Sequence, residues 1–314
     1  IKELLRDFLA MGYVGEDKNK LTVYLACVSC LLEKPLSVMI VSRSSAGKSS
    51  LQDAVLKLIP PESVVRFTAM TGQSLFYMDE NALKHKVLAI SENEGAYQAS
   101  YALKTIQSEG GLRIASTGKD PVSGKMKTHD YRVKGPVALL LITTDVDIDE
   151  ELMSRFITLS VDEDCSQTQK IHDQQRFERT LEGLQHQNAF RLLRKLKVVN
   201  PFARSLKFMT NRLRARRDND KYLNLIECVT FLFQYQRVVK SDGETDYIEV
   251  TKEDIAAAND LAKHIFSKSL DELFPPSRKL LNIIRELVEK RIALRDEEDM
   301  SPLTFNRRDL REFS

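Results

Sequence analysis

The chain of 314 residues contains no tryptophan, and only 7% of its residues are aromatic. No apolar run approaches the roughly 20 residues that a membrane-spanning helix needs, and the first residues lack the pattern of a signal peptide. Four cysteines are too few for a disulfide scaffold and favour a reducing compartment, so we expect a cytoplasmic protein without membrane contact. Because the net charge is only +2, any nucleic-acid-binding surface must be local.

Two of the cysteines, Cys27 and Cys30, form a single Cys-x-x-Cys pair. They lie in an apolar stretch with helical spacing, residues 21–32, and no second pair follows at the spacing of a zinc site. We therefore interpret both thiols as packed core side chains and not as metal ligands.

The apolar pattern predicts three parts along the chain. Residues 1–165 begin with helical segments broken near Gly12–Gly15 and then alternate strands with helices. This alternation predicts an α/β fold with a mostly parallel sheet flanked by helices. Residues 166–272 are expected to form an all-helical lid domain, and residues 273–314 the start of a winged-helix domain. Since the chain does not begin with methionine, we also expect it to be part of a longer protein.

Strands are expected at residues 37–41, 63–68, 86–91, 112–117, 127–133, 136–143 and 156–161. Helices are expected at residues 48–59, 73–84, 97–109, 166–197, 202–217, 219–238 and 251–270.

Residues 36–50 contain the pattern of a phosphate-binding loop. The apolar strand Val38–Val41 precedes the turn Ser42–Gly47, and Lys48 and Ser49 begin a helix, which is the context that this motif requires. Backbone N–H groups of such a loop and the N-terminus of the helix bind phosphate. We assign Lys48 to the β- and γ-phosphates of ATP and the Ser49 hydroxyl to Mg²⁺. The other expected nucleotide contacts are Ser44, Ser45, Ala46, Gly47 and Ser50.

A second apolar strand, 86–91, ends at Ser91 and is followed by Glu92-Asn93-Glu94. A nucleotide hydrolase needs a carboxylate at the end of a neighbouring strand to polarise the attacking water. Two assignments are open. In the first, Glu92 is the base and Ser91 is a weak metal contact, and in the second Glu92 lies near the metal and Glu94 is the base.

Two further features follow along the chain. The strand 136–143 is expected beside the phosphate loop, so that Thr143 or Thr144 at its tip could orient the attacking water or contact the γ-phosphate. Beyond it, Arg155 lies at the end of a short helical segment. A guanidinium in such a place can offset the charge that develops on a transferring phosphoryl group.

Two β-prone runs, Leu112–Thr117 and Met126–Val133, flank a turn segment and predict a hairpin. Lys119, Lys125 and Lys127 lie at or near its tip, which is therefore basic. Such side chains bind the phosphates of nucleic acid without reading its sequence. We expect the hairpin to contact DNA.

Three of these features together resemble the AAA+ ATPases, and among them the MCM-like helicase group, over roughly residues 10–235. They are the Ser-rich loop Ser42–Ser49, the segment Leu152-Met-Ser-Arg-Phe156, and the hairpin before strand 136–143. The resemblance implies an AAA+ fold, ATP with Mg²⁺, and a homo-oligomeric, hexameric ring. It also implies that Arg155 enters the site of the neighbouring subunit and that the hairpin touches DNA in the central channel of the ring.

In this group a basic residue of the lid contacts the γ-phosphate, and Lys221 and Arg217 are the candidates for that role. The basic residues Arg212, Arg214 and Arg216 could instead touch DNA. The sequence departs from the family at Ser42 and Ser91, and at Thr143 and Thr144, where an asparagine is commoner.

The chain is also similar to bacterial mobile-element proteins that join a primase-type region to such a motor. Our leading hypothesis is a ring-forming, ATP-dependent DNA helicase or translocase of a mobile element, active in DNA replication. The alternative is an ATP-dependent platform on DNA that recruits replication or transposition partners without processive unwinding. A small-molecule phosphotransferase is disfavoured, because it would have no use for Arg155 in another subunit or for a basic hairpin.

Overall fold

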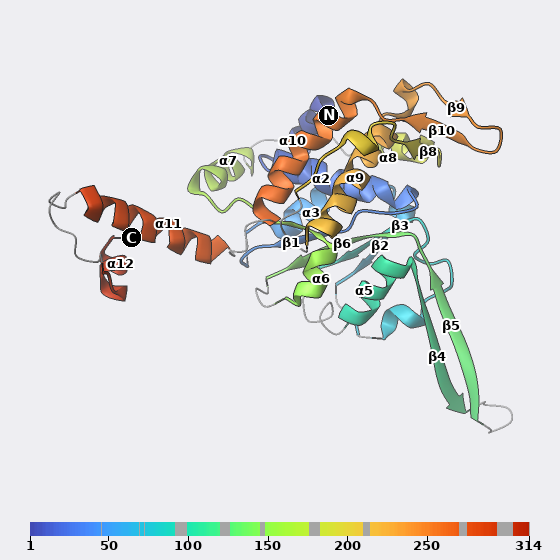
Figure 1. Ribbon diagram of the computed structural model, residues 1–314. Coiled ribbons are helices and arrows are strands. Elements are labelled where there is room, and N and C mark those ends of the chain that lie inside the picture. Colours follow the sequence, from blue (N-terminus) through green and yellow to red (C-terminus); the bar gives the residue numbers. More distant parts are fainter. Residues whose placement is uncertain are drawn as a thin grey trace. The chain divides into compact units, whose positions relative to one another are not determined.

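A computed structural model of the chain describes residues 1–314 except 45, 69, 72, 92–98, 120–125, 145–147, 176–182, 210–213, 270–274, 294–303 and 314 (Figure 1). The chain divides into two compact units, Ile1–Ser269 and Leu270–Ser314. None of the helices in the described ranges is both long and apolar enough to span a membrane.

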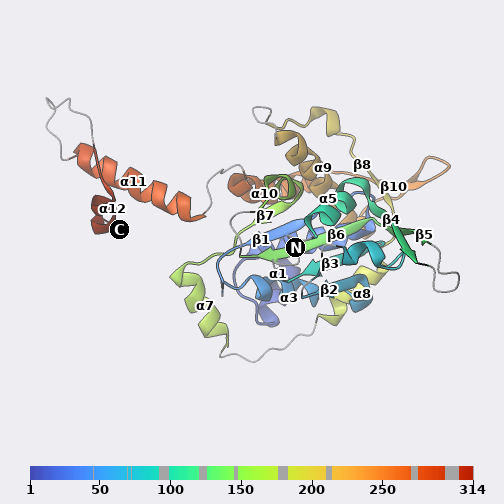
Figure 2. The ribbon, with the colours of Figure 1, turned by 90° about the horizontal axis from the view of Figure 1, so that it is seen from below.

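A parallel sheet of five strands forms the centre of the first unit, in the order β2-β3-β6-β1-β7 (Figure 2). The strands are β1 (Val38–Val41), β2 (Val64–Phe67), β3 (Lys86–Ile90), β6 (Val137–Thr143) and β7 (Ile157–Leu159). Every residue of β1 and β6 is buried, as expected for parallel strands that are covered on both faces. The prediction of a parallel α/β sheet is therefore confirmed.

Helices cover both faces of this sheet. Helices α5 and α6 pack on the face that carries Leu139 and Leu141 of β6, and helices α2 and α3 pack on the other (Figure 1). The first helices end and begin around residues 11–16, which confirms the predicted break near Gly12–Gly15. The bounds are α1 (Lys2–Ala10), α2 (Asp17–Val28), α3 (Lys48–Leu56), α5 (Ser100–Glu109) and α6 (Glu150–Arg155).

A long hairpin is inserted between α5 and β6 and projects from the body of the first unit (Figure 1). Its strands, β4 (Gly111–Lys119) and β5 (Met126–Lys134), are antiparallel and pair over their full length. Leu112 and Val133 at its base are buried in the core beneath α5. The predicted hairpin is confirmed, and each strand is longer than the sequence pattern indicated.

One helix predicted in the core is absent. Residues 73–84 form only a short 3₁₀ turn, η3 (Ser74–Tyr77), followed by turns. The segment turns because it inserts Leu75, Phe76 and Leu83 into the core beside the hairpin. The apolar spacing alone would fit one face of a helix. Asp79 and Asn81 favour turns, however, and the carbonyl oxygen of each accepts a turn hydrogen bond from the residue three positions ahead.

The part that follows β7 is not all-helical, contrary to the prediction. Its helices are α7 (Cys165–Gln175), α8 (Leu184–Leu192), α9 (Ala215–Leu232) and α10 (Lys252–Ser269). It also contains a three-stranded sheet in the order β8-β10-β9, formed by Lys197–Val199, Asp246–Glu249 and Lys240–Ser241.

Local chemistry explains this small sheet. The carboxylate of Asp242 accepts hydrogen bonds from the backbone N–H groups of Glu244 and Thr245, which closes the turn between β9 and β10. Ile248 of β10 is fully buried against the helices. The helix predicted for residues 202–217 is also wrong over residues 202–209, where the described chain contains only a short 3₁₀ turn, η4 (Ala203–Ser205).

The second unit contains α11 (Pro275–Ala293) and α12 (Arg307–Phe313). The Asn306 side chain accepts hydrogen bonds from the N–H groups of Arg308 and Asp309 and so caps α12. Asp309 in turn pairs with Arg291 of α11 at 2.7 Å. The predicted winged helix stays a prediction.

Candidate nucleotide-binding site

The phosphate loop lies between the end of β1 and the start of α3, as predicted. Gly47 has a φ of 95°, a left-handed conformation that glycine adopts without strain, and from it the chain enters α3. Ser49 and Ser50 are exposed in the first turn of this helix. The N-terminus of α3 is therefore open to an anion.

The side chain of Lys48 is folded back over the loop. Its Nζ donates hydrogen bonds to the carbonyl oxygen of Ser42, at 2.7 Å, and to that of Arg43. Burial lowers the pKa of Lys48 from its ordinary value, and Glu163 opposes this shift. Phosphate oxygens would replace the two carbonyls as acceptors when a nucleotide binds.

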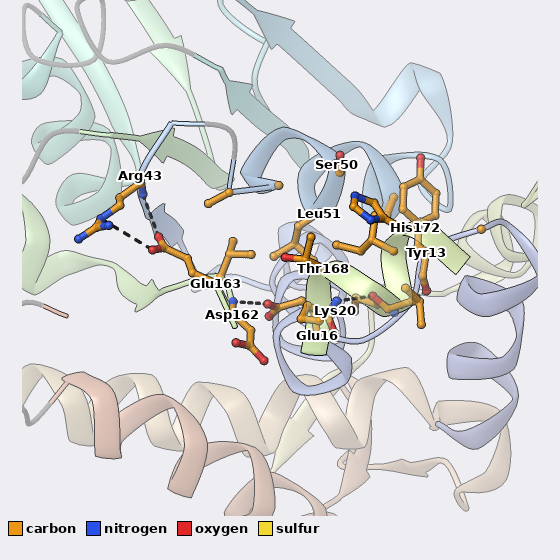
Figure 3. Close-up of a pocket in the computed structure, with 18 of the residues that line it drawn as sticks. Tyr13, Glu16, Lys20, Arg43, Ser50, Leu51, Asp162, Glu163, Thr168 and His172 are labelled. Atoms are coloured by element: carbon orange, nitrogen blue, oxygen red, sulfur yellow. Dashed lines mark hydrogen bonds and ion pairs between the residues drawn. The ribbon is translucent and has the colours of Figure 1, made fainter. Parts of the chain in front are cut away.

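A cavity of ≈ 570 Å³ opens beside the loop (Figure 3). The phosphate loop and the start of α3 form one wall, residues 12–16 between α1 and α2 form a second, and residues 161–163 with α7 form a third. Four of the predicted nucleotide contacts line it, namely Ser44, Ala46, Gly47 and Ser50. Ser45 lies outside the described residues.

The wall of the cavity formed by residues 12–16 was not predicted from the sequence. Gln167 of α7 donates from Nε2 to the carbonyl oxygen of Val14, at 2.9 Å, which ties α7 to this loop. Gly15 has a φ of 68°, and a Cβ there would lie 2.2 Å from Oε1 of Gln167. The two glycines within residues 12–16 were the sequence signal for this wall. They were interpreted only as a break between two helices.

Charged side chains lie around this cavity. The backbone N–H of Arg43 donates to Oε1 of Glu163 at 3.2 Å. The carboxylate of Glu16 accepts a hydrogen bond from the backbone N–H of Asp162. Lys20 donates to the carbonyl oxygen of Tyr13 at 2.7 Å, and burial lowers its pKa. The wall opposite the phosphate loop is therefore held together by polar contacts.

Strand β6 lies directly beside β1, as predicted. Thr143 pairs with Val41, and its carbonyl oxygen accepts a hydrogen bond from the N–H of Ser42 at 3.4 Å. Thr143 is buried, whereas Thr144, just beyond the strand, is exposed. Of the two predicted hydroxyls, Thr144 is therefore the one that solvent reaches at the edge of the sheet that carries the phosphate loop.

The sequence predicted that strand β3 would be a direct neighbour of β1. This prediction is wrong, because β6 lies between the two strands. The carboxyl ends of these parallel strands still share one edge. Just beyond β3, the Ser91 hydroxyl donates to Oε1 of Gln52 on α3 at 3.1 Å, and Nε2 of Gln52 donates to the carbonyl oxygen of Leu140. Glu92 and Glu94 lie outside the described residues.

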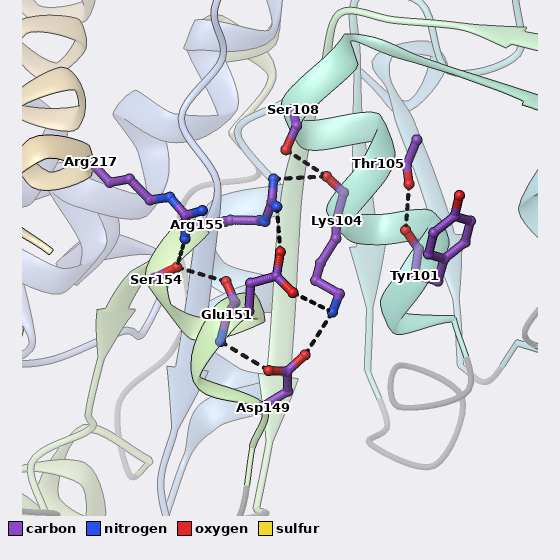
Figure 4. Close-up of polar contacts among 9 residues, drawn as sticks. All are labelled: Tyr101, Lys104, Thr105, Ser108, Asp149, Glu151, Ser154, Arg155 and Arg217. Carbon is purple, nitrogen blue, oxygen red and sulfur yellow. Dashed lines mark hydrogen bonds and ion pairs between the residues drawn. The ribbon is translucent and has the colours of Figure 1, made fainter. Parts of the chain in front are cut away.

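The guanidinium of Arg155, at the end of α6, is hydrogen-bonded to residues of the same chain (Figure 4). Its Nη2 donates to Oε1 of Glu151 at 2.8 Å, and its Nη1 donates to the carbonyl oxygen of Lys104 at 3.2 Å. Lys104 also pairs with Asp149, at 2.8 Å, and with Glu151, at 2.9 Å. Only 15% of the Arg155 side chain is exposed.

The two basic candidates of the lid lie near α6. Lys221 of α9 is buried, and its Nζ donates to the carbonyl oxygen of Phe156 and to Oδ1 of Asp218, each at 2.9 Å. Burial lowers the pKa of Lys221 to about 8. Arg217 donates to the hydroxyl of Ser154, next to Arg155 (Figure 4). Neither Arg217 nor Lys221 is among the described residues that line the cavity.

The described residues include no group of three or more histidine, cysteine or acidic side chains that could hold a metal ion. Cys27 and Cys30 are buried, and burial raises the pKa of both thiols, so their interpretation as core residues is confirmed. The expected DNA contact Lys125 lies outside the described residues, as do the side chains of Lys119 and Lys127.

A comparison with known families agrees with this geometry. The profile of the MTBMA_p00010 P-loop domain family matches residues 1–196, which include the five-stranded sheet, the phosphate loop and the hairpin. No curated protein matched the chain. Because the profile covers more than half of the sequence, the chain belongs to the MTBMA_p00010 P-loop domain family, and its first unit contains a P-loop nucleotide-binding domain.

Proposed function

We propose that the chain is an AAA+ ATPase of the MCM-like helicase type that assembles into a ring and moves along DNA. The observation that carries this proposal is the hairpin β4–β5, which rises from the sheet of the P-loop domain between α5 and β6. Residues 111–134 contain six lysines and arginines against two aspartates, a net charge of +4, whereas the whole chain carries only +2. A basic projection on a nucleotide-binding core suits a DNA-contacting element.

The position of the phosphate loop in the cavity wall would set the orientation of ATP. Its phosphates would lie at the loop and the N-terminus of α3, within reach of Lys48, and its base and ribose between residues 12–16 and α7. Ser49, exposed in the first turn of α3, would hold Mg²⁺ together with Glu92 or Glu94. Bound Mg²⁺ would offset negative charge on the phosphates. Glu92 or Glu94 would take the proton of the attacking water, and Thr144 would orient that water.

Arg155 is too far from its own phosphate loop to serve it. Strand β7 begins two residues after Arg155, and Ile157 pairs with Val38 at the amino end of β1. The loop begins at the other end of β1, four residues and roughly 13 Å further along the strand. Arg155 would therefore act in the site of a neighbouring subunit, where its guanidinium offsets charge on the transferring phosphoryl group. Arg217 would lie at the same interface.

A second candidate function is a DNA-bound platform that switches with ATP but unwinds little. The neutral pair Ser91–Gln52 favours it, because a serine occupies the position where a metal-binding aspartate is expected. Weak metal binding would slow hydrolysis and prolong the ATP-bound state.

A strand-displacement assay tests the motor. In the presence of ATP and Mg²⁺, the parent chain should unwind a forked DNA with a labelled strand. The Lys48→Ala variant should not unwind it. A protein that hydrolyses ATP but displaces no strand would contradict the helicase proposal. Glu92→Gln separates the two candidates, since a motor loses function whereas a platform stays bound to DNA and keeps recruiting its partners.

A further inference from the structure

Aromatic side chains gather on one face of the hairpin. Successive side chains of a strand point to opposite faces, so His129 and Tyr131, two positions apart on β5, share a face. Tyr77 of η3 packs edge-on against Tyr131, with ring centroids 4.8 Å apart and planes at 78°. The rings of His129 and Tyr131 are 6.3 Å apart. We call Tyr77, His129 and Tyr131 the aromatic face of the hairpin.

These rings are open to solvent. The exposed fraction is 46% for Tyr77 and 36% for Tyr131, and His129 is also exposed. Nearby, Tyr101 of α5 is 71% exposed and stacks on Phe76 with centroids 6.3 Å apart. Of the four exposed tyrosines in the described parts of the chain, only Tyr235 lies away from the hairpin and the elements packed at its base. A chain poor in aromatic residues thus exposes three tyrosine rings on or beside the basic hairpin.

The opposite face of the hairpin carries guanidinium groups. Arg113 and Arg132 are directly paired across the strands, and both donate hydrogen bonds to Asp130. The side chains are 67% exposed for Arg113 and 53% exposed for Arg132. Because two guanidinium groups share one carboxylate, this face keeps a net positive charge.

We propose that the aromatic face stacks the bases of single-stranded DNA, while the net positive charge of the hairpin attracts its phosphates. Every base has a π-face, so exposed rings on a basic element can bind unpaired strands without sequence preference. Bases within a duplex already stack on one another and are not available to these rings. The inference rests on the proposed function, because it takes the hairpin as the DNA-contacting element, and it narrows the ligand of that element to an unpaired strand.

The test measures binding of the 314-residue chain to three fluorescent ligands at one salt concentration. They are a 20-nucleotide oligo(dT), an abasic strand of equal length and a 20-base-pair duplex. We expect oligo(dT) to bind about tenfold more tightly than the abasic strand. Tyr131→Leu should lose about tenfold in affinity for oligo(dT), whereas its affinity for the duplex and for the abasic strand should stay within about twofold. Tyr131→Phe, which keeps the ring, should bind like the parent chain.

Tyr235→Leu is the matched control, since it removes an exposed tyrosine away from the hairpin and should change no affinity. Circular dichroism of each variant checks the fold, and the oligo(dT)–abasic comparison in the unmutated chain needs no variant. Equal binding of oligo(dT) and the abasic strand, or an unchanged Tyr131→Leu variant, would overturn the stacking inference and leave the proposed motor intact. A chain that binds none of the three ligands would overturn the DNA-contacting role of the hairpin itself.

Discussion

At the scale of single residues, Ser91 occupies the position where a metal-binding aspartate is expected. Its hydroxyl lies 3.1 Å from Oε1 of Gln52, one turn into the helix that follows the phosphate loop. This side chain is therefore close to the first turn of α3, where Ser49 is exposed. A neutral hydroxyl binds Mg²⁺ more weakly than a carboxylate does, because hard cations prefer charged oxygen ligands.

Replacing Ser91 by aspartate should strengthen metal binding. The new carboxylate would face α3, and the Gln52 amide can turn its NH₂ group toward it. We expect Ser91→Asp to lower the Mg²⁺ concentration for half-maximal ATP hydrolysis by about tenfold. A titration of ATPase activity with Mg²⁺ measures this. Ser241→Asp adds the same charge on β9 and should leave the titration unchanged, and an equal response of both variants would refute the role assigned to Ser91.

Gly15 is a second residue on which the cavity depends. Gly15→Ala would place a methyl group against the Gln167 amide, at a backbone φ that disfavours any side chain. The hydrogen bond that ties Val14 to Gln167 should be lost, and ATP affinity should fall by about tenfold or more. Equilibrium binding of a fluorescent ATP analogue measures this change.

Gly243→Ala is the control for this experiment. Gly243 has a φ of 93°, but a Cβ there meets no atom within 4 Å. The variant therefore carries comparable backbone strain without a clash and should bind nucleotide like the parent chain. Equal losses in the two variants would show that strain, and not the wall of the cavity, controls affinity.

At the scale of elements, α2 is unusual because the core surrounds it. Ten of its twelve residues are buried, among them Tyr24 and Cys27, and Cys30 follows it directly. Burial raises the pKa of Tyr24 and of Cys30 to about 12, and it raises that of Cys27 as well. The neutral forms of these groups are therefore part of the stability of the core.

Stability should consequently fall in alkaline solution. Below the ordinary thiol pKa of 9.0, both thiols are protonated in the folded and in the unfolded chain, so burial contributes in full. Above it the unfolded chain ionises first, and each thiol lowers the free energy of unfolding by up to about 1.4 kcal/mol per pH unit. Urea unfolding between pH 8 and about 11 measures this slope.

The double variant Cys27→Ala, Cys30→Ala should have a flatter slope than the parent chain. Val28→Ala, also in α2, removes packing at a fully buried position without removing a titratable group. It should lower the free energy of unfolding by about 1–2 kcal/mol at every pH and keep the parent slope. A double variant with the parent slope would contradict the assignment to the thiols.

The sequence predicted those elements whose side chains repeat with one period. Buried strands such as β1 and β6 are short apolar runs, and the hairpin has a turn segment between β-prone runs, so each was located within a few residues. The helix predicted for segment 73–84 is wrong because its apolar side chains have helical spacing, whereas Asp79 and Asn81 form turns with residues three positions ahead. The wall of the cavity at residues 12–16 failed for another reason: it depends on Gln167, about 150 positions away, and no local pattern records such a contact.

At the scale of the whole molecule, the proposed ring would complete the candidate site with a residue from a second chain. The phosphate loop lies at the carboxyl ends of the parallel strands, whereas Arg155 precedes β7 and lies at their amino ends. A head-to-tail arrangement of subunits, which generates a ring when the rotation closes, would bring the edge with Arg155 to the loop of the next copy. Each subunit would then supply half of two sites.

Mixing two inactive variants tests this arrangement. Lys48→Ala destroys the nucleotide half of the site, and Arg155→Ala destroys the half supplied to the neighbour. In a random one-to-one ring, about a quarter of the interfaces combine two intact halves, so ATPase activity should return to about a quarter of the parent value. Subunits must be exchanged before the assay, and each variant alone is the control. If co-assembled variants stay inactive, Arg155 does not act between subunits.

The position of β6 has a mechanical consequence. Its amino end continues from hairpin strand β5, and its carboxyl end is bonded to the phosphate loop through Thr143 and Ser42. Seven buried residues, roughly 23 Å of extended chain, lie between these two points. A strand held by neighbours on both sides is stiff along its axis, so β6 would transmit a displacement from the phosphate loop to the base of the hairpin. A shift of the loop by a fraction of an ångström would therefore be passed to the base of the hairpin, and any rotation of that base would move the tip further than the base.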